Sequence, residues 1–100
     1  MRTKERERMT TVQPELLHSL GKLIARSRKR AGLTQKHLHI SCTNFGCLIS
    51  EASIARIEKG TRDISFYEFE VIDRIIHIRN SDEFKELMDD YITRQQRLHN

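Results

Sequence analysis

Two cysteines and two histidines stand close together near the middle of this chain: His37, His39, Cys42 and Cys47. Thiolate sulfur and imidazole nitrogen are the ligands that zinc prefers, and two neighbouring thiols could also form a disulfide. The four residues lack the paired ligands separated by a long loop that are typical of zinc sites. We therefore expect no metal site and no functional disulfide, and two free thiols in a reducing compartment.

The adjacent carboxylates Asp89 and Asp90 are the other candidate for chemistry. Neighbouring residues on a helix point about 100° apart, so these two carboxylates do not converge on one substrate. The sequence has no phosphate-binding P-loop, no glycine-rich dinucleotide motif and no nucleophile elbow. It predicts a protein that is not an enzyme and needs no cofactor.

The composition indicates one small globular domain. The chain has 100 residues, of which 37% are hydrophobic and 32% charged, and this balance is typical of a folded protein. Lys and Arg number 18 against 14 acidic residues, and a basic excess is compatible with a polyanionic partner.

Nothing in the sequence predicts a membrane protein. No apolar run approaches the roughly 20 residues that a transmembrane helix needs. The first residues, MRTKERERMT, are charged and lack the apolar core of a signal peptide. We expect residues 1–11 to form a charged arm and the protein to stay in the cytoplasm.

The sequence predicts that helices position the candidate side chains. It has one proline, four glycines and no long runs of alternating apolar and polar residues. Pro14 suits the first turn of a helix that Gly32 ends. Thr34 can cap a short second helix with Leu38 on its inner face. Residues 42–50 then break the helical pattern.

Three further helices follow. Ser50 can cap a third helix that buries Ile54 and Ile57 and ends before Gly60. The sequence from Ser65 to Glu68 fits a capping box that opens a fourth, and a fifth begins after residue 81. The sequence thus predicts five helices and no sheet.

The fifth helix has the clearest amphipathic stripe in the chain: Phe84, Leu87, Met88, Tyr91 and Ile92. We expect the early residues of this stripe to close the core. The later ones, Tyr91 and Ile92, are predicted to face a second copy of the chain in a homodimer.

Three stretches carry a family resemblance, and they occur in this order: LGKLIARSRKRAGLTQKHL, ISEASIARIEKG and TRDISFYEFEVI. Together they resemble the Cro/lambda-repressor-like helix-turn-helix family, also called the xenobiotic-response-element (XRE) family, over residues 16–78. The resemblance implies an all-α, five-helix DNA-binding domain at residues 12–80, with a long turn. Residues 81–100 would form a C-terminal helix for core closure and dimerisation.

The function that this resemblance implies is sequence-specific binding of double-stranded DNA. The protein would be a bacterial or phage transcriptional regulator, a repressor, associated with the nucleoid and bound as a homodimer to a near-palindromic operator. Its third helix would be the recognition helix, with one face buried and the other in the major groove.

The resemblance also implies individual roles. The expected DNA-binding residues are Gln35, Lys36, Ser50, Glu51, Ala52, Ser53, Arg56, Lys59 and Arg62. Gln35 would contact a phosphate at the start of the second helix, and Lys59 and Arg62 would contact the DNA backbone. Arg56 could bind guanine and Glu51 could accept from cytosine, although each could instead be a solvated surface residue. Arg28 and Glu58 would form a structural ion pair, for which the alternative is two unpaired surface charges.

Two features depart from the family pattern. His39 stands where the family usually has a small residue, and the connection to the third helix is about five residues longer than usual. A less common branch has a longer second helix or turn, and Ile49, Ser50 and the Gly60–Arg62 segment match it. The angle between the second and third helices therefore stays open.

Two alternatives belong to other classes of protein. The chain could be an antitoxin or another protein–protein adaptor, whose helix-turn-helix serves as a scaffold and whose partner is a toxin. It could also be a metal or thiol sensor, an alternative that depends on the Cys/His cluster alone.

Overall fold

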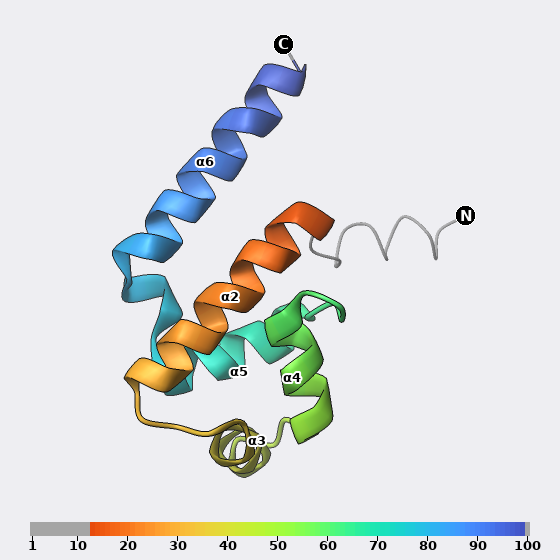
Figure 1. Cartoon of the computed structure of the whole chain (residues 1–100), viewed down its shortest axis with the longest axis vertical. Coiled ribbons are helices and arrows are strands. Elements are labelled where there is room, and N and C mark those ends of the chain that lie inside the picture. The colour runs from red at the N-terminus through yellow and green to blue at the C-terminus, as the bar shows by residue number, and fades with distance from the viewer. Residues whose placement is uncertain (1–12, 100) are drawn as a thin grey trace, which may run out of the picture.

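The computed structural model describes residues 13–99, and in that range the protein is all-α. Its elements are α2 (Pro14–Arg30), α3 (Gln35–Asn44), α4 (Glu51–Lys59), α5 (Phe66–Ile76), the short 3-10 helix η1 (Ile78–Asn80) and α6 (Asp82–His99) (Figure 1). The prediction of five helices and an all-α class is confirmed for these residues. The arm expected at residues 1–11 lies outside them.

Side-chain caps begin four of the helices at the residues that the sequence predicts. The hydroxyl oxygens of Thr34, Ser50 and Ser65 each accept a hydrogen bond from a backbone N–H three residues later, all at 3.0 Å. Ser81 does the same for α6 at 3.1 Å. Each bond satisfies a backbone N–H that has no partner within its helix.

Two local features differ from the sequence expectation. α3 continues to Asn44 rather than ending where the pattern breaks at residue 42. Cys42 lies one turn beyond Leu38 and both are fully buried, so the thiol extends the apolar face of the helix. The turn η1 was not expected, and His77 precedes it in a left-handed conformation with φ of 56°.

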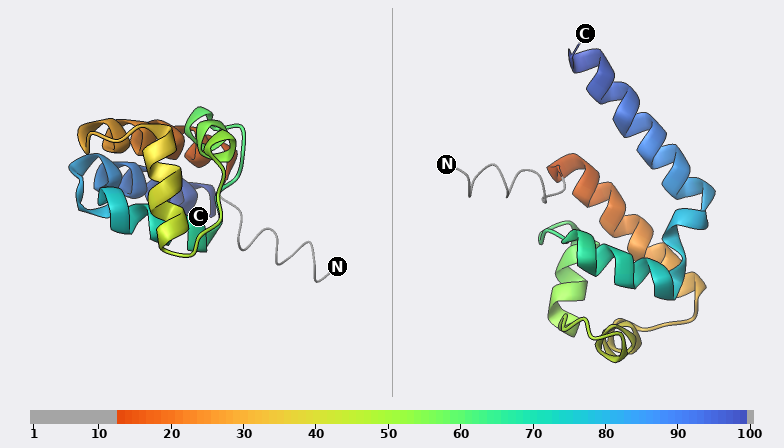
Figure 2. Two further views of the ribbon diagram at one scale, coloured as in Figure 1. Left: turned by 90° about the horizontal axis from the view of Figure 1, so that it is seen from below. Right: turned by 180° about the vertical axis from the view of Figure 1, so that it is seen from behind.

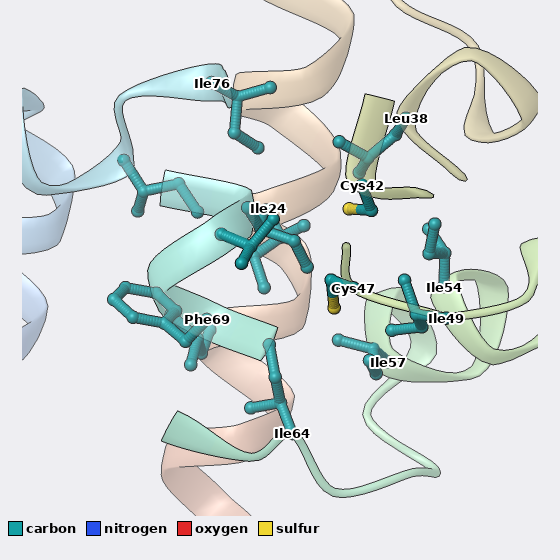
Figure 3. Packing of buried hydrophobic residues seen from close by; sticks show 14 of the residues in the cluster. Ile24, Leu38, Cys42, Cys47, Ile49, Ile54, Ile57, Ile64, Phe69 and Ile76 are labelled. Atoms are coloured by element: carbon teal, nitrogen blue, oxygen red, sulfur yellow. The ribbon is translucent and has the colours of Figure 1, made fainter. Parts of the chain in front are cut away.

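The hydrophobic core lies where α2, α3, α4 and α5 meet (Figure 3). Ile24 from α2, Ile57 from α4 and Ile72 from α5 are at most 1% exposed. α6 joins this core through its first turns, where the ring of Phe84 stacks on that of Phe69 at 5.9 Å between centroids. Leu87 packs against the same cluster.

The rest of α6 extends beyond the core. Glu83 ties the start of this helix to the last turns of α2 through ion pairs with Arg26 and Arg30, at 3.3 and 2.7 Å. From there the two helices diverge, and the C-terminal half of α6 projects away from the other helices (Figures 1 and 2). No helix in the described range is long and apolar enough to cross a membrane.

The long connection between α3 and α4, residues 45–50, is anchored in the core. The side chains of Cys47 and Ile49 are buried in it. The backbone N–H of Cys47 donates to the carbonyl of Cys42 at 2.9 Å, and Gly46 provides the left-handed turn, with φ of 85°. The extra residues therefore form a packed turn.

Candidate nucleic-acid interface

α4 has one buried face and one outward face, as a helix that contacts a large partner requires. Ile54 and Ile57 are buried at its inner side. The outward face carries exposed Glu51, Arg56 and Lys59. Two small exposed residues, Ser50 and Ala52, and half-buried Ser53 complete its N-terminal end.

α2 approaches the C-terminal half of α4 so closely that only glycine fits between them. A Cβ placed on Gly21 would lie 2.3 Å from the carbonyl oxygen of Ile57 and 2.9 Å from that of Glu58. A Cβ on Gly60, just past the end of α4, would lie 2.9 Å from the Cα of His18. Backbone packs directly on backbone here, which fixes the position of α4 relative to α2.

The expected ion pair between Arg28 and Glu58 is present and ties the same two helices together. Arg28 Nε lies 2.6 Å from Glu58 Oε2 and Nη2 lies 2.9 Å from Oε1, a bidentate geometry between side chains only 9% and 6% exposed. The hydrogen bond to Glu58 is the main cause that raises the pKa of Arg28. Arg28 Nη1 also donates to the Leu33 carbonyl at 2.8 Å.

Gln35 extends this network to α3. Its side-chain amide donates to Glu58 Oε1 at 2.9 Å, so one carboxylate links α2, α3 and α4. The side chain expected to touch phosphate is thus held by an internal bond. Gln35 is the first residue of α3, so a phosphate there could still meet the free backbone N–H groups of the first turn.

The side chains of Arg56, Lys59 and Lys36 are exposed and can contact a partner. Arg56 Nη2 makes one long hydrogen bond, 3.4 Å, to Ser53 Oγ, and Ser53 also accepts from Ser50 Oγ at 3.0 Å. Lys59, in the last turn of α4, and Lys36, in the first turn of α3, are exposed. These three cations are available for bases or phosphates.

The guanidinium of Arg62, an expected contact of the DNA backbone, is paired within the chain. It makes a bidentate pair with Glu68, both distances being 3.1 Å, and Nη1 also donates to the Asp63 carbonyl at 2.8 Å. Burial acts to raise the pKa of Glu68, but hydrogen bonds from Arg62 and from the Ser65 backbone outweigh it and hold that pKa below its usual value. Any contact of Arg62 with DNA must use its remaining N–H groups.

The four residues of the Cys/His cluster have separate roles. His37 Nδ1 accepts from the Thr34 backbone N–H at 3.4 Å in the capping box of α3, and His39 bonds to a carbonyl. Burial is the first cause that raises the pKa of both thiols, to about 11 for Cys42. In the described part of the chain no three His, Cys, Asp or Glu side chains are grouped to hold a metal ion.

Tyr91 and Ile92, the residues expected at a dimer interface, lie on the part of α6 that leaves the core. Tyr91 is half-buried and Ile92 is 50% exposed. Leu98, two turns further along, is exposed as well. The described part of the chain therefore covers Tyr91 in part and leaves Ile92 and Leu98 largely uncovered.

The sequence analysis did not predict three contacts near α4. An isolated glycine inside a strong helical pattern often has a packing cause, so Gly21 could have been noticed as a contact point. The hydrogen bond from Gln35 to Glu58 joins residues 23 positions apart, and that from His39 to Ile49 joins residues 10 positions apart. Neither bond could be predicted from a local sequence pattern.

No protein-family model matches the sequence, and no curated protein matches it.

Proposed function

We propose that this chain is a sequence-specific regulator of transcription that binds double-stranded DNA and acts as a repressor. In this proposal the fold is that of the Cro/lambda-repressor-like (XRE) family, α3 and α4 form the helix-turn-helix, and α4 enters the major groove. The observation that carries the proposal is the position of α4, which is fixed on α2 by Gly21 and Glu58. Its free face presents Arg56 and Lys59.

The side chains divide into those that would recognise bases and those that would anchor the backbone. Arg56 has the geometry to give two hydrogen bonds to guanine O6 and N7, and Glu51 could accept from cytosine N4. Lys36, in the first turn of α3, and Lys59, in the last turn of α4, would neutralise phosphates. Arg62 contributes mainly through its pair with Glu68, which supports the segment between α4 and α5.

A homodimer is part of the proposal. One recognition helix contacts only a few base pairs, which gives little discrimination against a genome of competing sites. Two copies related by a twofold axis would place their α4 helices about one DNA turn, ~34 Å, apart on a near-palindromic operator. The C-terminal half of α6, with half-buried Tyr91 and half-exposed Ile92, is the surface available for this pairing.

Selection from a pool of random DNA duplexes tests the function. We expect the wild type to enrich a near-palindromic sequence. Arg56→Ala should relax the preference at one base pair, at a cost of about 1–3 kcal/mol. Lys59→Ala should weaken binding to all sequences alike and make the salt slope shallower by about one unit.

Lys85→Ala, which removes an equal charge from α6, is the matched control and should leave the salt slope unchanged. If no sequence is enriched over random competitor at low salt, the proposal of a specific regulator fails. If both α4 variants lose affinity uniformly, Arg56 is a phosphate contact and does not read a base.

One observation favours the adaptor function as a second candidate. Outside α6, four large apolar side chains of the described residues are more than half exposed: Phe45, Leu48, Phe66 and Tyr67. Exposed apolar surface often marks a protein interface. An antitoxin would use it to bind a toxin encoded beside it, and co-purification of the two products, lost in Leu48→Glu, would support this function if no DNA is selected.

A further inference from the structure

The imidazole of His39 makes a bond that reaches from α3 to the start of α4. Its Nδ1 lies 2.6 Å from the carbonyl oxygen of Ile49. A carbonyl oxygen can only accept, so Nδ1 carries the proton and donates. Ile49 directly precedes Ser50, the N-cap of α4, and the bond therefore links the middle of α3 to the first residues of the outward-facing helix.

The other bonds of this connection are local. Gly46 N–H donates to the Thr43 carbonyl at 2.8 Å, Cys47 N–H to Cys42 at 2.9 Å, and Ile49 N–H to Cys47 at 3.1 Å. They shape the turn but span no more than five residues. The His39 bond spans ten and closes the turn at its far end.

We propose that His39 is a positioning residue that, together with the Gln35–Glu58 bond, sets the distance and angle between α3 and α4. The two departures from the family pattern, a large residue at this position and a long connection, then form one arrangement. The long connection is packed into the core through Cys47 and Ile49, and the imidazole ring holds the Ile49 carbonyl at its far end. The role in DNA binding rests on the proposed function, whereas the bond itself is present without DNA.

The protonation pattern of the ring provides the first test. A free neutral imidazole carries its proton mostly on Nε2, so the bond predicts the opposite tautomer for His39, with the proton on Nδ1. Two-bond ¹⁵N–¹H correlation spectra of the wild type distinguish these forms. A neutral ring protonated on Nε2 would overturn the proposal.

Three substitutions provide the second test. His39→Asn keeps an N–H donor at the δ position and has a similar helix propensity, so it should preserve the bond. His39→Gln moves the donor one bond further out, and His39→Ala removes it. We expect the amides of Ser53 and Ile54, at the start of α4, to exchange with solvent about five- to tenfold faster in the Gln and Ala variants only.

Two controls separate local opening from a general loss of stability. The amide of Leu23, in the buried part of α2, should be much less affected than those of α4. Ile40→Ala, an exposed position on the same helix, should behave as the wild type. Wild-type exchange in His39→Ala, or exchange in His39→Asn as fast as in His39→Ala, would show that the bond does not position α4.

The DNA measurement uses the sequence that the wild type selects. His39→Ala should lose about five- to tenfold of the preference for that sequence over random duplex, and His39→Asn should retain it. If the wild type selects no sequence, the proposed function fails and the exchange experiment still decides the role of His39. If the wild type selects one and His39→Ala retains the full preference, the positioning role fails alone.

Discussion

Two regions of the molecule differ in how firmly a helix is held. α4 is held tightly at the junction where it packs on α2, whereas the C-terminal half of α6 has few contacts with the other described helices. At the junction, Gly21 lets the backbones touch, and the carboxylate of Glu58 accepts hydrogen bonds from two other helices. On α6, by contrast, Ile92 and Leu98 carry apolar side chains that the described residues leave exposed. α4 is therefore fixed with its polar face outward, whereas the C-terminal half of α6 exposes apolar side chains.

Length explains much of this difference. α4 has nine residues, and a helix this short is marginal in water unless tertiary contacts stabilise it. α6 has 18 and can continue as a helix beyond the core. Fixed position and polar exposure thus occur together on α4, as the proposed recognition of a rigid duplex requires. The free apolar face of α6 suits pairing with a second copy.

The substitution Gly21→Ala should have the largest effect, because it disrupts the junction itself. Its methyl group would meet the carbonyl oxygens of Ile57 and Glu58, and we expect a loss of about 3 kcal/mol or more in the free energy of unfolding. Gly32→Ala is the matched control. Nothing lies within 4 Å of its added Cβ, and its left-handed backbone should cost about 1–2 kcal/mol.

Urea unfolding of both glycine variants measures the difference. Equal stability of the two would mean that α4 can move away from α2 at little cost. α4 would then be no more firmly held than the C-terminal half of α6.

The second largest effect is expected at high pH, which should lower the free energy of unfolding through the buried thiol of Cys42. Burial raises the pKa of the Cys42 thiol from 9.0 to about 11, so folding favours the neutral thiol. This contribution to stability is complete below pH 9 and is lost as the pH rises through 11, at about 2–3 kcal/mol. Urea unfolding across this range should show a steeper loss for the wild type than for Cys42→Ala, and equal slopes would contradict the burial of the thiol.

The smallest effect on stability, and the sharpest on assembly, is expected at Ile92. The side chain is half exposed, so Ile92→Glu should change the stability of one folded chain by less than about 0.5 kcal/mol. A charge there should nevertheless split the dimer that we propose. Light scattering at micromolar concentration should give twice the 11.8 kDa chain mass for the wild type and a single chain for the variant.

Thr93→Glu is the control for this experiment. It adds the same charge at the next residue, which is also exposed and points about 100° away around the helix. It should leave the dimer intact. A wild type with the mass of one chain, on DNA as well as in free solution, would rule out the pairing.

The sequence was informative wherever a pattern is local. Caps at Thr34, Ser50 and Ser65 follow from residue type and from the apolar positions that come after them. The buried and exposed faces of α4 follow from helical periodicity, which places Ile54 and Ile57 on one side. These signals need no knowledge of the rest of the chain.

Contacts between distant residues could not be predicted in this way. The Arg28–Glu58 pair was expected only because the sequence resembles a family, since no physical rule joins residues 30 positions apart. The same limit applied to Arg62, for which the resemblance implied a contact with the DNA backbone but did not indicate the ion pair with Glu68. His39 stands where the family usually has a small residue, and no local pattern indicates its bond to the Ile49 carbonyl ten residues away.

A titration followed by amide chemical shifts tests the central claim, that the outward face of α4 binds DNA. The Ile92→Glu variant and a random-sequence duplex at low salt should be used, so that pairing of chains cannot itself shift the signals of α6. We predict that the largest changes fall at residues 34–36 and 50–62, and that residues 84–98 stay unchanged. Changes concentrated on α6 or at residues 66–67, with α4 unperturbed, would contradict this account.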